Sequence, residues 1–292
     1  LFKWIDLEFV NNRNLTNYFN VYKNSYDRLN LIAQNFNVEQ DWVDSNNNLN
    51  IPEGATNFID AVINNETPLT VEDNEYKTIN TVKERQDRLT ANNLILGSSF
   101  SLNFNSQESI FDENFYQLRW KLDWVGSVLN QILNGLNGEE DAEGNNVFGG
   151  VSPSQYVKTE LDFIKHWKLG REQVIAFHAF TGIALPFGNS NNMPFSRSFF
   201  SGGSNDNRAW KAYKLGPGSS SNINEFNEAN LKIAFNLEYR FPLAGPLKGG
   251  VFIDTGNIWN LWDDVEDPAM KFEGFQDLTE IAIGSGFGLR YD

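Results

Sequence analysis

The 292-residue sequence contains no cysteine and only two histidines, His166 and His178. The absence of cysteine excludes disulfides, thiolate metal sites and cysteine nucleophiles. The two histidines lack the close spacing of a zinc motif, and nothing in the sequence pairs them with a serine nucleophile. We therefore expect neither a metal centre nor a bound cofactor.

Long apolar runs and basic residues are also scarce. No stretch approaches the roughly 18 consecutive apolar residues of a membrane helix, so crossing a membrane by helices is excluded. The 23 basic and 38 acidic residues give a net charge of -15, which argues against a nucleic-acid partner. The acidic clusters at 139–141 and 263–267 lack the order of a calcium loop and are typical of solvated loop tips.

A low mean hydropathy of -0.44 is combined with an aromatic content of 14%. A transmembrane β-barrel produces this combination, because lipid-facing apolar residues alternate with lumen-facing polar ones, and aromatic residues collect at both interfaces. Such alternation is present at 1–10 and recurs from residue 94 onward, most clearly at 231–241. The predicted strands cover residues 1–10, 94–106, 115–125, 155–168, 173–186, 231–241, 247–260 and 277–291. We expect an all-β fold in which neighbouring strands pair antiparallel in sequence order.

The connections alternate in length, as in an outer-membrane barrel with short periplasmic turns and long extracellular loops. Residues 11–92 are rich in Asn, Asp and Glu. We expect a long extracellular insertion there, largely irregular, with short helices near 56–64 and 76–88. Another short helix is predicted at 127–136. Short turns are predicted at 107–114, 169–172 and 242–247, and long loops at 11–92, 129–152, 187–228 and 261–275.

Residues 199–218 form a glycine-punctuated loop with one arginine among aromatic residues. The loop begins with Phe199-Phe-Ser-Gly-Gly203, continues through Asn207-Arg208-Ala209-Trp210 and ends with Leu215-Gly-Pro-Gly218. It resembles the signature loop of the BamA/TamA-like outer-membrane assembly-factor superfamily, also called bacterial surface antigens. Asn207 replaces that family's β-branched residue, and Ala209 replaces its glycine. The resemblance extends more weakly over residues 94–292.

The resemblance implies a multi-pass β-barrel of the sixteen-stranded type in the outer membrane of a Gram-negative bacterium. The eight strands present would be the seventh to the fourteenth. Because an open arc would expose unpaired backbone groups to lipid, we expect residues 1–292 to be a partial outer-membrane β-barrel domain of a longer chain. Within it, 11–92 would be the extracellular insertion, and 187–228 the signature loop folded into the lumen.

The resemblance also implies a site, because the family's loop arginine pairs with acidic residues on the inner wall of the next two strands. Glu238 and Asp254 stand at the matching positions, and the alternation independently points both inward. With Arg208 they would make charge-assisted hydrogen bonds that lock the loop in the lumen. The alternative is three unrelated charges in wet surroundings. Packing of the loop is assigned to its aromatic and glycine residues: Phe200, Gly202, Gly203, Trp210, Tyr213, Gly216 and Gly218.

The function implied by the resemblance is not enzymatic. It is the insertion of β-barrel proteins, or the translocation of surface proteins, through a weakly paired seam that templates a client strand. The implied partners are client outer-membrane proteins, outer-membrane lipids, and periplasmic or lipoprotein accessory subunits. A passive porin and a secretion pore of the two-partner type are the alternatives.

One further motif, Phe252-Ile-Asp-Thr-Gly256, is similar to that of aspartic proteases. Their chemistry needs two carboxylates that share a proton, and this sequence has no second copy of the motif. An acid hydrolase built on Asp254 would therefore need a partner chain. A strand that ends in Asp-Thr-Gly is the simpler interpretation.

Overall fold

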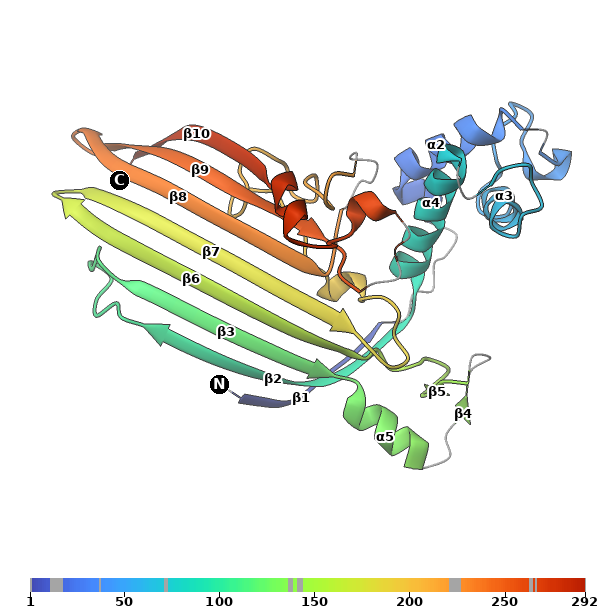
Figure 1. The fold of residues 1–292 in the computed structure, drawn as a ribbon, viewed down its shortest axis with the longest axis horizontal. Helices are drawn as coiled ribbons and strands as arrows, with labels where there is room; N and C mark the ends of the chain where they lie inside the picture. The colour runs from blue at the N-terminus through green and yellow to red at the C-terminus, as the bar shows by residue number, and fades with distance from the viewer. Residues whose placement is uncertain are drawn as a thin grey trace.

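The computed structural model describes residues 2–10, 18–36, 38–70, 73–135, 139–140, 144–220, 227–262, 265 and 267–291. Its main element is an antiparallel sheet of eight strands in the order β1-β2-β3-β6-β7-β8-β9-β10 (Figure 1). The predicted meander is thereby confirmed. The strands are β1 (Phe2–Val10), β2 (Asn93–Asn105), β3 (Tyr116–Val125), β6 (Tyr156–Gly170), β7 (Gln173–Pro186), β8 (Leu231–Ala244), β9 (Leu247–Trp259) and β10 (Ala282–Tyr291). A separate ribbon pairs β4 (Glu139–Glu140) with β5 (Asn146–Val147).

Two strand boundaries differ from the prediction by about three residues or more. β10 begins at Ala282, because the preceding residues form the 3-10 helix η5 (Phe275–Glu280). β8 continues through Pro242, which lies opposite Lys248 near the end of the hairpin. Proline is tolerated there because the register shifts between Pro242 and Ala244, and such an irregularity accepts a residue that cannot donate to the ladder. The predicted turn at 242–247 therefore shrinks to residues 245 and 246.

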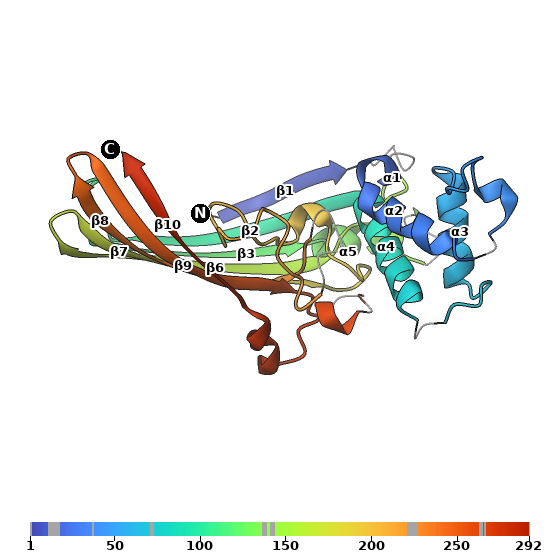
Figure 2. The ribbon, with the colours of Figure 1, turned by 90° about the horizontal axis from the view of Figure 1, so that it is seen from above.

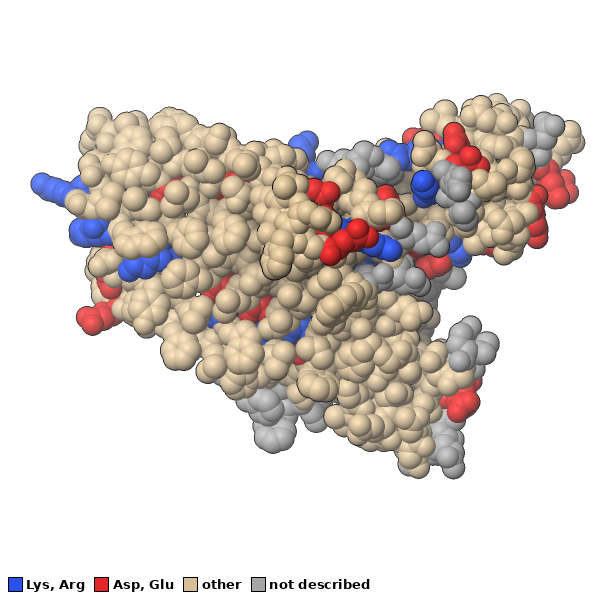
Figure 3. Space-filling view, viewed as in Figure 1, with Lys and Arg blue, Asp and Glu red and all other residues tan. Residues whose placement is uncertain are grey.

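The two faces of the sheet differ in polarity. In Figure 2 the strands form a trough, and the gold-coloured segment that follows β7 lies within it. The convex face over the strands shows few charged residues (Figure 3), which suits contact with lipid. Exposed apolar side chains on the strands include Trp120, Trp124, Leu161, Trp167, Phe235, Leu237, Val251, Ile253, Ile283 and Phe287.

The segment between β1 and β2 forms a helical subdomain beyond one end of the sheet (Figure 1). It contains α1 (Tyr18–Val21), α2 (Lys23–Ala33), the 3-10 helix η2 (Gln40–Trp42), α3 (Glu53–Ile63) and α4 (Asn74–Thr90). Across the part of the chain that the structure describes, no helix is long and apolar enough to span a bilayer. Outside this subdomain, the short 3-10 helix η4 (Pro268–Met270) precedes η5 between β9 and β10.

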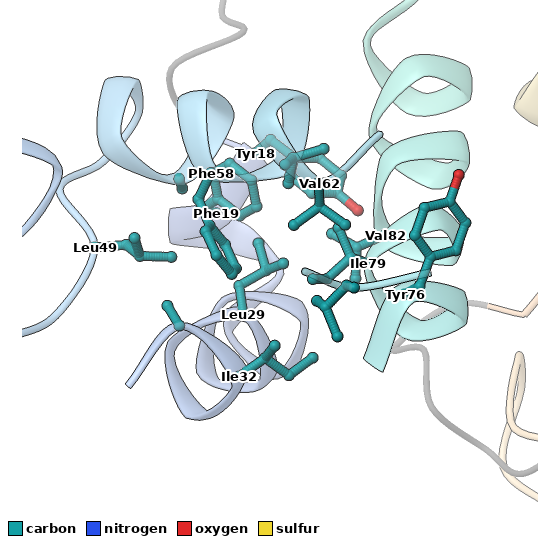
Figure 4. Packing of buried hydrophobic residues seen from close by; sticks show 14 residues of the cluster. Tyr18, Phe19, Leu29, Ile32, Leu49, Phe58, Val62, Tyr76, Ile79 and Val82 are labelled. Carbon is teal, nitrogen blue, oxygen red and sulfur yellow. The ribbon is translucent and has the colours of Figure 1, made fainter. Parts of the chain in front are cut away.

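The prediction of a largely irregular insertion is wrong, because these helices share a hydrophobic core (Figure 4). α3 and α4 match the two predicted helices, whereas α2 was not predicted. The apolar residues are sparse in the sequence, but they recur one helical turn apart, as Phe58 and Val62 do in α3 and Ile79 and Val82 in α4. All four side chains are 1% exposed or less. Residues 11–17 lie outside the described residues.

We predict that Ile79→Ala destabilises the helical subdomain by about 2 to 5 kcal/mol, because it opens a cavity in the core. Hydrogen exchange should accelerate in α3 and α4, while the strands keep their protection. Leu31→Ala, at a position 64% exposed on α2, is the control and should change little. Unchanged exchange in α3 for Ile79→Ala would contradict the shared core.

Candidate functional site

The loop between β7 and β8 presents Arg208 from a tight turn. Gly202 has a φ of +95°, and a Cβ there would lie 2.3 Å from the carbonyl oxygen of Lys211, so the position requires glycine. Asp206 stabilises the turn, because its Oδ2 accepts hydrogen bonds from the backbone N of Gly202 (2.7 Å) and from Ser201 Oγ (2.9 Å). The loop thus closes on itself before it reaches the sheet.

The register of the strands determines which residues of the concave face lie next to each other where Arg208 contacts the sheet. Residues of one face lie in rows across neighbouring strands, because paired residues of antiparallel strands share a face. One row crosses β7, β8, β9 and β10 and contains His178, Asn236, Asp254 and Gly284. The next row contains Ala176, Glu238, Phe252 and Gly286. The two acidic residues predicted from the sequence therefore lie in adjacent rows, one on β8 and one on β9.

Arg208 binds both acidic residues. Its Nε donates to Asp254 Oδ2 and its Nη2 to Asp254 Oδ1, each at 2.8 Å, and its Nη1 donates to Glu238 Oε2. The backbone N of Arg208 adds a hydrogen bond of 3.0 Å to Asp254 Oδ2. The guanidinium carbon lies 3.5 Å from the ring centroid of Phe252, within range of a cation–π contact. The structure thus brings together the three residues predicted from the sequence.

Burial makes this contact energetically important. The Asp254 side chain is fully buried, and those of Arg208 and Glu238 are 26% and 21% exposed. Hydrogen bonds to Asp254 and then to Glu238 raise the pKa of Arg208, so the guanidinium is charged at every physiological pH. Removal of one partner from a buried pair typically costs about 3 to 5 kcal/mol, because the remaining charge is left uncompensated.

A row of polar contacts continues from Asp254 along the inner wall, and sequence reasoning missed it. Asn236 Nδ2 donates to Asp254 Oδ1 at 2.9 Å and to the backbone oxygen of Asp206 at 2.7 Å. His178 Nδ1 lies 3.0 Å from Asn236 Oδ1, and His178 Nε2 lies 3.5 Å from Asp162 Oδ1. Asn236 therefore orients the carboxylate and also holds the loop backbone.

The residues assigned to loop packing are engaged to different degrees. Trp210 and Tyr213 are half-buried. Phe200 is 39% exposed and stacks on Tyr213 with ring centroids 4.1 Å apart, whereas its neighbour Phe199 is only 6% exposed. Backbone pairing of Phe199 with Ala229 explains the difference, because adjacent residues of an extended segment point to opposite sides. Phe200 therefore packs within the loop on Tyr213, whereas Phe199, which was not among the assigned residues, packs against the sheet.

Phe199 is the residue that fills the position against the sheet. A Cβ on Gly182 of β7 would lie 2.4 Å from the Phe199 ring, so glycine makes room for that ring. Among the predicted loop glycines, Gly216 has a φ of +76°, and a Cβ there would lie 2.4 Å from Asn257 Oδ1. Gly203 and Gly218 also have positive φ values, of 108° and 52°.

Gly284 of β10 makes room for the tip of the loop. A Cβ on Gly284 would lie 2.6 Å from the Cβ of Ala209 and 2.7 Å from Asn207 Oδ1. Asn207 is 1% exposed, and its Nδ2 donates to the backbone oxygen of Ala282 at 3.4 Å. The two residues that depart from the resembled family's pattern, Asn207 and Ala209, are thus both accommodated by β10.

A second attachment of the loop comes from the helical subdomain. Arg88 of α4 donates to Glu228, near the end of the loop, at 2.7 Å, and the two side chains are 10% and 6% exposed. The residues are 140 positions apart, and neither belongs to a motif. No signal in the sequence indicates this pair.

We predict that Arg208→Ala releases the loop, at a cost of about 3 to 5 kcal/mol, because Asp254 stays buried without its cation. Trypsin should cleave faster at Lys211 and Lys214, and the heat-resistant folded band on gels should weaken. Arg208→Lys should rescue only partly, since an ammonium lacks the planar fork of the guanidinium. Arg171→Ala, in the exposed β6–β7 turn, is the control. If trypsin cleaved Arg208→Ala at the wild-type rate, the proposal that Arg208 holds the loop in place would be refuted.

A second prediction concerns the space at β10. Gly284→Ala should displace the loop tip, with an overpacking cost of about 1 to 3 kcal/mol. Gly288→Ala is a matched control on the same face of the same strand, because a Cβ there meets nothing within 4 Å. Thermal unfolding and trypsin cleavage should change for Gly284→Ala alone. Equal effects of the two substitutions would mean that the loop tip does not depend on this space.

A match to a protein family agrees with the resemblance of the signature loop. The Omp85 superfamily domain matches residues 5–292. Among solved structures, BamA from Haemophilus ducreyi lacking POTRA domains 1–3 is similar, with 17% sequence identity and a TM-score of 0.38. That match covers 68% of this chain and 48% of that one, so the chain spans about half the length of the solved protein. Because the superfamily domain matches nearly every residue, the chain belongs to the Omp85 superfamily.

Proposed function

We propose that this chain is part of a β-barrel in the bacterial outer membrane that inserts or translocates other proteins. Membership of the Omp85 superfamily supports this function in general. The observation that carries the proposal is the bidentate contact of Arg208 with the fully buried Asp254, which holds the loop on the concave wall. The exposed apolar side chains of the convex face support the placement in lipid.

The loop held by Arg208 connects three neighbouring strands of the sheet. Arg208 joins β8 to β9 through Glu238 and Asp254, and the loop tip rests on Gly284 of β10. These three strands therefore keep their register while another part of the barrel rearranges. In the proposed mechanism, a client strand adds through main-chain hydrogen bonds at a seam between the first and last strands of the complete barrel. Such bonds do not depend on the client's side chains, so one seam serves many clients.

The proposal assigns no enzymatic chemistry to the site. Asp254 accepts hydrogen bonds from the backbone N, Nε and Nη2 of Arg208 and from Asn236 Nδ2. A carboxylate that is engaged in this way and fully buried is a poor general base, because base catalysis needs hydrogen-bonding reach to a substrate proton. The proposed partners are client outer-membrane proteins, outer-membrane lipids, and periplasmic or lipoprotein accessory subunits.

Reconstitution into lipid vesicles tests the proposal. Urea-denatured client β-barrel protein, added from outside, should fold faster with the wild-type protein than with empty vesicles, as measured by heat-modifiable mobility on gels. Arg208→Ala should lose most of this acceleration, and Arg171→Ala should keep it. Swelling of the vesicles in small sugars without faster client folding would favour a passive porin and overturn the proposal. Delivery of a soluble client into the vesicle interior, without barrel folding, would identify a secretion pore instead.

A further inference from the structure

The helix α5 (Ser127–Gly135) follows β3 and projects beyond the end of the sheet, away from the helical subdomain (Figure 1). Its sequence, Ser-Val-Leu-Asn-Gln-Ile-Leu-Asn-Gly, contains no charged residue, although the whole chain has a net charge of -15. A surface helix of a protein in water usually has charged or polar residues on its outer face. α5 therefore lacks the charged outer face that is usual for a helix in water.

α5 packs on the protein through an aliphatic side chain, because Leu133 is only 6% exposed. Asn130 and Asn134 lie one turn apart on another side of the helix, where Asn130 Oδ1 accepts a hydrogen bond from Asn189 and Asn134 Oδ1 accepts one from Asn146. Val128 and Ile132 also lie one turn apart, are 66% and 51% exposed, and occupy the opposite side of the helix. The aliphatic side chains of α5 therefore continue from the side that packs on the protein to an exposed side without charge, which suits apolar surroundings.

The exposed face of α5 continues the apolar surface of the sheet. Trp124, the last outward residue of β3, is 55% exposed, and its indole Nε1 donates to Ser127 Oγ at 2.7 Å, at the start of the helix. Trp120 precedes it on the same face. An indole has an apolar body and one polar N–H, so it favours the boundary between lipid and water. The apolar surface thus extends from β3 through Trp124 to Val128 and Ile132.

We propose that α5 is an interfacial anchor that places Val128 and Ile132 in the boundary between the headgroups and acyl chains of the membrane beside β3. This inference rests on the proposed placement of the sheet in the outer membrane. Lipid fits better than a protein partner, because two aliphatic side chains on a nine-residue helix offer far less than the ~800 Å² per partner of a stable protein interface. Helices of this kind lie in the membrane plane with the apolar face buried about 5 to 10 Å.

The absence of native cysteine allows a direct test. Ile132→Cys, labelled with an environment-sensitive fluorophore, is reconstituted in phosphatidylcholine vesicles that contain lipids with a spin label on the acyl chain. The label should show blue-shifted emission, and shallow spin labels should quench it more strongly than deep ones. Two matched positions serve as controls. Leu161→Cys reports the exposed convex face of β6, and Leu31→Cys reports the exposed surface of α2.

Each outcome decides a different question. If the label at 161 is quenched by lipid and the label at 132 behaves like that at 31, the anchor is refuted while the membrane barrel stands. If the label at 161 is not quenched either, the placement of the sheet in lipid fails, and the proposed function fails with it. Emission at 132 that shifts with the protein-to-lipid ratio, without lipid quenching, would indicate contact with a second copy and overturn the anchor.

Discussion

The buried carboxylate of Asp254 is the constraint on which the rest of the site depends. An isolated charge in such a position is strongly unfavourable, so the fold must supply a cation and further donors. Arg208 supplies three hydrogen bonds, and Asn236 supplies a fourth. Two glycines allow Arg208 to reach this carboxylate. Gly202 permits the turn that presents the arginine, and Gly284 leaves space for the tip of the loop against β10.

The same two-residue alternation that forms the strands also separates two environments. Along β9, Phe252 and Asp254 contact the loop, whereas Val251 and Ile253 are 44% and 50% exposed on the other face. Polar contacts on the concave side and apolar side chains on the convex side therefore arise from one pattern. Closing such a sheet would enclose a polar, loop-filled interior within an apolar exterior, the organisation expected of a transmembrane barrel.

Sequence reasoning predicted the strands because their alternation is local, and it predicted the Arg208 contacts because a motif and the strand phase agreed. It failed where contacts join distant segments. The alternation shows that Asn236 faces inward, but only the register shows that it lies opposite Asp254. The sequence could not show which of Phe199 and Phe200 faces the sheet, because that depends on the pairing of Phe199 with Ala229. The core of the helical subdomain was missed because its apolar residues are few and spread over separate helices.

The ion pair between Arg88 and Glu228 links the helical subdomain to the loop between β7 and β8. If residues 18–90 were exchanged for a short turn, Glu228 would lose its cation at a site where its side chain is 6% exposed. The penalty would fall on the signature loop, far along the chain from the deletion. The subdomain is therefore not a freely exchangeable module. Changes in its length or composition are constrained by a carboxylate that belongs to another part of the protein.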